Sequence, residues 1–293
     1  METVMKTELQ LPLLGVGKVR ETYLLQDKLL MVATDRLSAF DVVFHEGIPH
    51  KGIVLNMLSK FWFEKTTDII KNHFVSVKMP PELPAYLRGR SMIVQQAKPL
   101  RVECVVRGYI TGSAWKEYQQ NGSVCGIELE KDLKNGSRLS KPIFTPSTKA
   151  EKGHDENISF EQAAELIGEK AATAIRDKSL KLYEFGRDYS LKKGLVLADT
   201  KFEFGLLGDK IILIDEAMTP DSSRYWISEE YNKGNLVSMD KQFVRDFLER
   251  SNWNKSPPPP KLPADVVANT SKLYVKTYEM LTDRNVLDDV KNI

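Results

Sequence analysis

The stretch LADTKFEFG contains a row of charged residues whose spacing could serve chemistry. In an extended strand side chains alternate between two faces, so Asp199, Lys201 and Glu203 would share one face. Phe202 and Phe204 would point to the other face. Two carboxylates beside an ammonium group could surround a divalent cation and an anionic ligand. A solvent-facing strand could also carry this row for solubility alone.

The strand KIILID follows after a Gly-Asp turn and ends at Asp215. The length of the turn decides which face Asp215 joins, because a one-residue shift in pairing moves a side chain to the opposite face. Three-residue loops would place Asp215 opposite Glu203 or Lys201, whereas a two-residue loop would place it opposite Phe202 on the apolar face. The sequence leaves these alternatives open. On the charged face Asp215 and Glu203 would repel each other, and Mg²⁺ would suit the pair because it takes one or two carboxylates with phosphate oxygens and water.

Two loops have the composition of an anion-binding site. TPDSSRYW combines turn residues, hydroxyls and an arginine, which together could form a phosphate or carboxylate cradle. VVRGYITGSAW ends a predicted strand at Arg107 and places Ser113 where it would cap a helix that begins at Ala114. Helix N-termini bind phosphates through free N–H groups. Each loop could also be no more than the start of the next regular element.

Near the N-terminus, GVGKVRETY places Gly15 and Gly17 before Lys18 and a β-rich run. The motif is not a Walker A loop, because Val19 stands where a serine or threonine is required. It is more similar to the glycine-rich flap that a β-hairpin places over nucleotide phosphates. An ordinary turn is the alternative.

Two further polar segments are candidates for substrate contact. TDRLSAFD brings Ser38 and Asp41 to the end of a predicted strand, where loops commonly hold ligands. TPSTKAEKGHDE carries Lys149, Lys152 and His154 and is long enough to cover a bound substrate. His154 has no triad partners in the sequence and is not a candidate base.

The periodicity predicts a β-rich first part and a mixed second part. The expected helices cover residues 54–70, 114–121 ending at Gly122, 160–194 with a break near Ser179, 240–250 and 264–284. Ser159 and Gln162 predict a capping box before the longest of these helices. The proline-rich segment after residue 78 marks a boundary. We therefore expect a lobe of residues 1–95 that carries the flap, and a lobe of residues 96–293 that carries the metal and substrate sites and a C-terminal helical extension.

The composition excludes several classes of protein. Among 293 residues, 42 lysines and arginines balance 40 aspartates and glutamates, so no basic field favours nucleic acid or a membrane surface. Two cysteines cannot form a disulfide framework. No apolar run is long enough to span a bilayer, and the N-terminal segment lacks the pattern of a signal peptide. We expect a cytoplasmic protein with small-molecule partners.

Six motifs together resemble the SAICAR synthetase (phosphoribosylaminoimidazole-succinocarboxamide synthase) family of purine biosynthesis. In chain order they are GKVRETY, TDRLSAFD, ECVVRGYITGSAW, PSTKAEKGHDE, LADTKFEFG and DEAMTPDSSRYW. The resemblance spans essentially the whole chain. The late PPPPKLP is similar to the longer, yeast-like members.

The resemblance implies an ATP- and Mg²⁺-dependent ligase that joins the carboxylate of carboxyaminoimidazole ribotide to the amine of L-aspartate, with release of ADP and phosphate. A free carboxylate does not readily form an amide, so we expect ATP to convert it to an acyl phosphate. The implied fold is α+β and two-lobed, with a β-rich, kinase-like N-terminal lobe, an α+β C-terminal lobe and nucleotide in the cleft. A monomer is expected over a dimer, because the C-terminal extension could cover a surface that shorter relatives use for association.

The same resemblance implies roles for individual residues. Nucleotide contacts would come from Gly17, Lys18, Arg20 and Lys149. The metal and nucleotide would be bound by Glu203 and Asp215. Ribotide or aspartate contacts would come from Ser38, Asp41, Arg107, Ser113, Asp221, Ser222, Ser223 and Arg224. The reaction centre would be lined by the catalytic candidates Asp199 and Lys201.

Two alternatives remain open from the sequence. One is another ATP-dependent enzyme on a related two-lobed scaffold, such as a small-molecule kinase, which would form ADP without aspartate. The other is a non-catalytic module that binds a nucleotide or metabolite without releasing phosphate.

Overall fold

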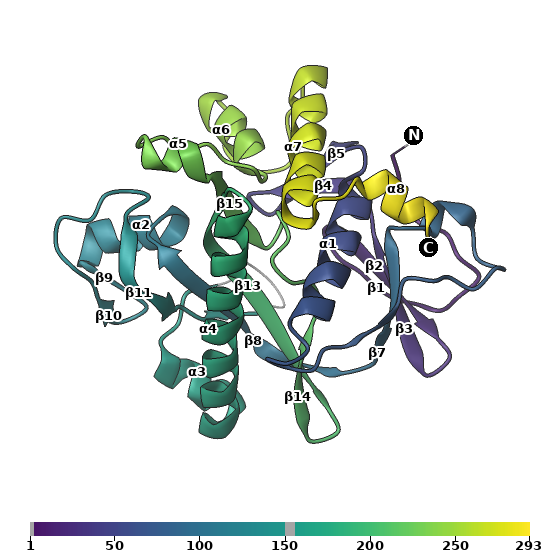
Figure 1. The fold of residues 1–293 in the computed structure, drawn as a ribbon, viewed down its shortest axis with the longest axis horizontal. Coiled ribbons are helices and arrows are strands. Elements are labelled where there is room, and N and C mark those ends of the chain that lie inside the picture. The colour runs from purple at the N-terminus through teal and green to yellow at the C-terminus, as the bar shows by residue number, and fades with distance from the viewer. Residues whose placement is uncertain (1–2, 150–155) are drawn as a thin grey trace.

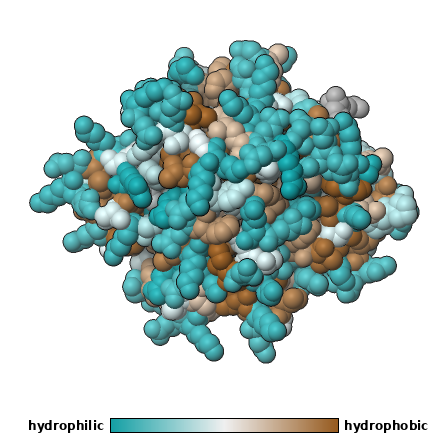
Figure 2. Space-filling view, in the orientation of Figure 1, coloured by the Kyte–Doolittle hydropathy of each residue, from teal (hydrophilic) through white to brown (hydrophobic). Residues whose placement is uncertain are grey.

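The computed structural model describes residues 3–149 and 156–293, which form two lobes of mixed α/β structure lying side by side (Figure 1). Lys152 and His154 lie outside the described residues. On the face drawn in Figure 2, hydrophilic side chains predominate. No helix in the described part of the chain is both long and apolar enough to cross a membrane.

The first lobe is built on an antiparallel five-stranded sheet in the order β1-β2-β3-β7-β6. Its strands are β1 (Leu13–Val16), β2 (Arg20–Leu25), β3 (Lys28–Ala33), β6 (Phe74–Ser76) and β7 (Ser91–Gln95). A separate hairpin pairs β4 (Arg36–Ala39) with β5 (Val42–Gly47), and η1 (Ala85–Leu87) precedes β7. The turn between β1 and β2 carries the glycine motif.

Helix α1 (Lys51–Lys65) packs against this sheet and begins earlier than the predicted residue 54. Residues on several sides of the helix are buried, because the C-terminal helix α7 also packs against it. The helix ends before Thr66, whose backbone N–H and hydroxyl both donate to the carbonyl of Trp62 at 3.0 and 2.7 Å. The predicted extension to residue 70 is therefore wrong.

Close backbone packing at the start of α1 gives a stability prediction. A Cβ at Gly52 would lie 2.2 Å from the carbonyl oxygen of Ala33, whereas a Cβ at Gly15 would meet nothing within 4 Å. We expect Gly52→Ala to lower the free energy of unfolding by about 1–3 kcal/mol, because an overpacked core must shift. Urea unfolding measures this difference, with Gly15→Ala as the matched control. Equal stability of the two variants would contradict the packing described here.

The second lobe is built on a larger antiparallel sheet in the order β11-β8-β13-β14, with β12 added beside β8 and β15 beside β13. Its strands are β8 (Lys98–Tyr109), β11 (Arg138–Phe144), β12 (Ser147–Thr148), β13 (Leu195–Leu207), β14 (Lys210–Ile214) and β15 (Ser223–Ile227). The short helix α2 (Gly112–Asn121) and the small hairpin of β9 (Ser123–Val124) and β10 (Ile127–Glu128) lie at the edge of this lobe (Figure 1).

Two helices, α3 (Phe160–Ile167) and α4 (Glu169–Lys192), cover the second sheet. The capping box of Ser159 and Gln162 is confirmed. The predicted break near Ser179 is wrong, since Ser179 is buried within α4. The break lies at Gly168, whose φ of 86° is a left-handed conformation that glycine adopts without strain.

The chain finishes with α5 (Ser228–Asn232), α6 (Gln242–Arg250), α7 (Ala264–Thr282) and α8 (Val286–Lys291). Helices α7 and α8 return to the first lobe and pack against α1 (Figure 1). The C-terminal segment thus contacts both lobes, and the boundary at residues 95 and 96 stays a prediction.

Strand β13 places the charged row as predicted. Phe202 and Phe204 are fully buried in the core. The β13–β14 turn has two residues, because Leu207 pairs with Lys210. This is the register that predicts Asp215 on the apolar face. Asp215 nevertheless does not join the apolar face, since β14 ends at Ile214 and Asp215 takes a left-handed φ of 65° that removes it from the strand.

Candidate active site

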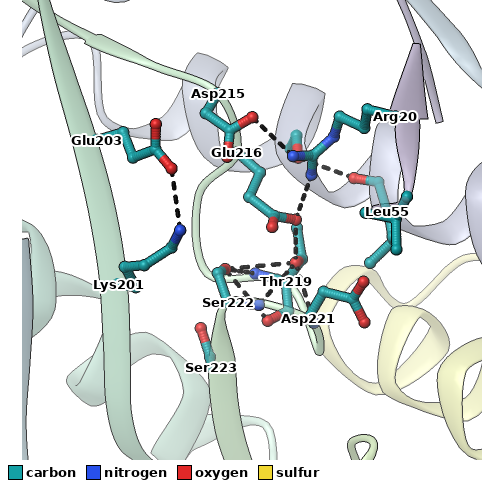
Figure 3. A network of polar contacts seen from close by, with 12 residues as sticks. Arg20, Leu55, Lys201, Glu203, Asp215, Glu216, Thr219, Asp221, Ser222 and Ser223 are labelled. Atoms are coloured by element: carbon teal, nitrogen blue, oxygen red, sulfur yellow. Dashed lines mark hydrogen bonds and ion pairs between the residues drawn. The ribbon is translucent and has the colours of Figure 1, made fainter. Parts of the chain in front are cut away.

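Lys201 and Glu203 of the charged row on β13 form an ion pair (Figure 3), which is part of a compact ion-pair network. Lys201 Nζ donates to Glu203 Oε1 at 2.9 Å and to Glu103 Oε1 at 2.6 Å, and Lys149 pairs with the other oxygen of Glu203. Burial alone would raise the pKa of Glu203, but the two lysines outweigh it and lower the pKa to about 2. Burial alone would lower the pKa of Lys201, but Glu203 and Glu103 raise it. Both groups therefore stay charged near neutral pH.

Asp215 lies across from this row and is held by the first lobe (Figure 3). Arg20, the first residue of β2, reaches Asp215 Oδ1 with Nη1 at 2.7 Å and Glu216 Oε2 with Nη2 at 2.6 Å. Burial and the neighbouring carboxylates of Glu203 and Glu216 raise the pKa of Asp215 to about 6 despite the charge of Arg20. Asp215 and Glu203 are thus close enough to repel each other.

The pair of carboxylates fits a divalent cation that is completed by other ligands. Within residues 3–149 and 156–293, no group of three or more His, Cys, Asp or Glu residues could hold a metal ion by itself. Asp215 and Glu203 supply two carboxylates, and their mutual repulsion is what a cation would relieve. This donor set suits Mg²⁺, which keeps water and phosphate oxygens in its coordination shell.

A second polar cluster surrounds Asp199 at the other end of the row. Asp199 Oδ2 accepts from Arg107 Nη1 at 3.0 Å and from Arg224 Nη1 at 2.5 Å. Arg107 Nη2 also donates to the hydroxyl of Ser113 at 3.1 Å. Asp199 is thus shared by two arginines, which it orients side by side. The arrangement leaves positive charge for an anionic ligand.

Close packing fixes Arg224 beside the start of α2. A Cβ at Gly112 would lie 2.3 Å from Arg224 Nη2, and the φ of Gly112 is 59°.

The prediction that Ser113 caps this helix is wrong. Thr111 occupies the N-cap position without a side-chain hydrogen bond, and the helix begins at Gly112. The hydroxyl of Ser113 instead accepts from Arg107 and can also donate to a ligand.

The TPDSSR loop uses most of its polar groups to hold its own shape. The carboxylate of Asp221 accepts from Lys51 Nζ and from the Tyr274 hydroxyl, both at 2.6 Å. Ser222 and Ser223 are buried, and their hydroxyls bond to Thr219 and to Thr200 respectively. Each of these three residues therefore acts on a ligand mainly by shaping the loop that presents Arg224.

One cavity of about 720 Å³ lies where these clusters meet. Nine of the predicted site residues line it: Lys18, Arg20, Ser38, Asp41, Ser113, Lys201, Asp215, Asp221 and Arg224. A smaller adjoining cavity of about 90 Å³ is lined by residues that include Asp199, Ser222 and Ser223. Four predicted residues are not among the lining residues of either cavity. Arg107 and Glu203 contact the lining residues Ser113 and Lys201, Lys149 pairs with Glu203, and Gly17 donates its N–H to the Arg20 carbonyl at 2.7 Å.

The flap residues face the same cavity. Lys18 forms an ion pair with Asp41, so the turn between β1 and β2 is joined to the segment between β4 and β5. Both side chains are about half exposed, at 52% and 45%. This exposure leaves them accessible to a ligand.

Two cations that were not predicted from the sequence, Lys241 and Arg245, line both cavities. Burial lowers the pKa of Lys241 to about 8 despite the charge of Asp221, and burial also lowers the pKa of Arg245. Together with Arg224 they form a cationic cluster that an anion would stabilise. Lys241 and Arg245 are four residues apart at the start of the predicted helix 240–250, and this spacing places both side chains on one face of the helix. This was the sequence signal that could have identified them.

Comparisons with known proteins define the class and then the family. Residues 13–260 match the SAICAR synthetase family model. Curated relatives named phosphoribosylaminoimidazole-succinocarboxamide synthase include one from Thermodesulfovibrio yellowstonii, 51% identical over 287 residues, with 95% of this chain and 98% of the relative covered. One from Pelobacter propionicus is 52% identical over 281 residues, with 93% and 95% covered.

Solved structures agree. A SAICAR synthase from Saccharomyces cerevisiae complexed with SAICAR has a TM-score of 0.86 and 43% identity, covering 97% of this chain and 99% of that one. A SAICAR synthetase in complex with ADP has a TM-score of 0.72 and 26% identity, covering 92% and 98%. The protein is therefore an ATP-dependent ligase of purine biosynthesis. It belongs to the SAICAR synthetase family, and both the resemblance to yeast-like members and the two-lobed α+β fold are confirmed.

Proposed function

We propose that this chain forms SAICAR from carboxyaminoimidazole ribotide, L-aspartate and ATP in the cytoplasm, as a monomer of two lobes that meet near residues 95 and 96. The observation that carries this proposal is the cavity of about 720 Å³, whose lining includes the carboxylates of Asp215 and Glu216 and the cationic cluster of Arg224, Lys241 and Arg245. The triphosphate of ATP, the ribotide and aspartate are all anionic, so together they would need such cations and a metal ion held by the carboxylates.

The nucleotide would lie between the flap and the carboxylate pair. Gly17, Lys18 and Arg20 would contact its phosphates, with Lys149 approaching from β12. Glu203 and Asp215 would hold Mg²⁺, which when bound would neutralise phosphate charge. The raised pKa of Asp215, about 6, reflects a crowded set of carboxylates that a cation would relieve.

The ribotide would lie at the opposite end of the charged row. Arg107, Ser113 and Arg224 would hold its phosphate, since two arginines side by side offer forked donors for phosphate oxygens. Asp199 aligns both arginines by accepting from each of them. The substrate walls would be completed by Ser38, Asp41, Asp221, Ser222 and Ser223.

The reaction would proceed near Lys201 in two steps, a phosphoryl transfer followed by an acyl transfer. A carboxylate oxygen of the ribotide attacks the γ-phosphorus, and the bond to ADP breaks to give an acyl phosphate. The amine of aspartate then attacks the acyl carbon, and inorganic phosphate leaves as the amine loses its proton. Lys201 would stabilise negative charge and not act as a base, because Glu203 and Glu103 raise its pKa.

Lys241 and Arg245 would bind the carboxylates of aspartate. We expect kcat/KM for aspartate to fall as the pH rises through about 8, because burial lowers the pKa of Lys241 to that value. Above this pH the Lys241 side chain is neutral and no longer attracts the carboxylates of aspartate. Lys241→Arg keeps its charge and should remove this alkaline decrease. A pH profile of kcat/KM for both proteins measures the effect, and identical profiles would contradict the assignment.

A phosphate-release assay tests the proposed function. The protein is mixed with ATP, Mg²⁺, ribotide and aspartate, and each component is omitted in turn. Release that requires all four supports the ligase. ADP formation without aspartate would favour a small-molecule kinase, and binding without release in every mixture would favour a non-catalytic module. Light scattering on the purified chain tests the monomer.

A further inference from the structure

Thr219 organises the loop that presents Arg224 through a single hydroxyl (Figure 3). Its Oγ1 donates to Glu216 Oε2 at 2.5 Å and accepts from the backbone N–H groups of Asp221 at 3.2 Å and Ser222 at 3.4 Å. Thr219 is fully buried and Glu216 is 7% exposed. Because the hydroxyl proton is committed to Glu216, its lone pairs face the loop amides.

Glu216 is in turn held by the nucleotide flap. Its Oε2 also binds Arg20 Nη2 at 2.6 Å, and Arg20 follows Lys18 of the flap by two residues. The other end of the loop is tied to the charged row, since the N–H of Lys201 donates to the carbonyl of Ser222 at 2.8 Å. A continuous set of hydrogen bonds therefore runs from the flap to the loop two residues before Arg224.

We propose that Glu216 and Thr219 are positioning residues that couple nucleotide binding at the flap to ribotide binding at Arg224. The inference rests on the proposed function. When nucleotide phosphates bind the flap, they hold Arg20 in place against Glu216. Glu216 then holds the Thr219 hydroxyl, and this hydroxyl holds the turn that presents Arg224. Coupling of this kind is reciprocal, so ribotide bound at Arg224 strengthens nucleotide binding by the same factor.

Calorimetric titration tests the coupling without measuring turnover. SAICAR is titrated into the protein with and without ADP and Mg²⁺, and the ratio of the two dissociation constants is compared between variants. In the unmodified protein we expect ADP to tighten SAICAR binding about 5- to 150-fold. Thr219→Val should reduce this ratio to about 1–2, while Thr219→Ser, which keeps the hydroxyl, should retain it.

Two further variants make the test decisive. Glu216→Gln keeps the shape of the side chain but loses the charge that holds Arg20, so it should also lower the ratio, and it decides the outcome if Thr219→Val fails to fold. Thr270→Val removes an equally buried hydroxyl that donates to the Val266 carbonyl at 2.7 Å on α7, and it should leave the ratio unchanged.

A purely structural role predicts a different result. Thr219→Val and Glu216→Gln would then weaken SAICAR equally with and without ADP, and an unchanged ratio would overturn the inference. A ratio of one in the unmodified protein would overturn it as well, while leaving the proposed function in place. Failure of the unmodified protein to bind SAICAR or ADP at all would overturn the proposed function, and the inference with it.

Discussion

Glu203→Gln and Asp215→Asn should each reduce turnover by about three orders of magnitude or more, because each removes one of the two charges proposed to hold the metal and the nucleotide phosphates. The fold should survive both changes, since the substituted amides keep the volume of the acids they replace. Steady-state phosphate release at saturating Mg²⁺ measures the loss, and circular dichroism checks the fold.

The neighbouring Glu103 offers a matched control. It is buried to a similar degree as Glu203, each being 8% exposed, and it also accepts from Lys201. It has no proposed role in metal binding, so Glu103→Gln should cost less activity and leave the Mg²⁺ dependence unchanged. Activity near that of the unmodified protein in Glu203→Gln or Asp215→Asn would refute the metal site.

Arg224→Ala should raise KM for the ribotide about 10- to 100-fold, because a hydrogen bond to a charged group contributes about 1.5–3 kcal/mol. KM for ATP should change much less, since Arg224 lies at the Asp199 end of the row and away from the flap. Initial rates at varied ribotide and at varied ATP separate the two effects.

An arginine that does not line the cavity provides the control for this prediction. Arg187 on α4 pairs with its neighbour Asp188 at 2.8 Å, and the Arg187 side chain is 23% exposed. Arg187→Ala should therefore leave both KM values unchanged. An equal rise in KM for ATP and ribotide in Arg224→Ala would indicate general damage to the cavity and would contradict a phosphate-binding role.

The position of Asp215 shows which parts of the site strand alternation can predict from the sequence and which it cannot. Alternation along β13 correctly placed the charged row opposite Phe202 and Phe204, because a strand with one buried face has a fixed side-chain period. Alternation along β14 could not place Asp215. A strand period holds only while the strand lasts, and Asp215 lies beyond the end of β14 with a left-handed φ. Its carboxylate accepts from Arg20, which is 195 residues away in the chain.

The features of the site that were not predicted from the sequence have a similar cause. Motif composition identified the loop around Arg224, but the sequence does not show that the loop hydroxyls and Asp221 are committed to Thr219, Lys51 and Tyr274. Of these partners, Lys51 and Tyr274 come from distant segments of the chain, and Thr219 belongs to the loop itself. Glu216, Lys241 and Arg245 gain their importance from the same long-range packing, which periodicity alone does not describe.

The fate of the ribotide carboxylate oxygens tests the central claim most directly. When the carboxylate is labelled with ¹⁸O and the protein turns over with ATP, Mg²⁺ and aspartate, phosphorylation of that group followed by attack of the amine transfers one labelled oxygen to inorganic phosphate. Mass spectrometry of the released phosphate should therefore find one ¹⁸O atom per turnover. Phosphate free of label would show that the carboxylate is never phosphorylated in this cavity, and would contradict the account.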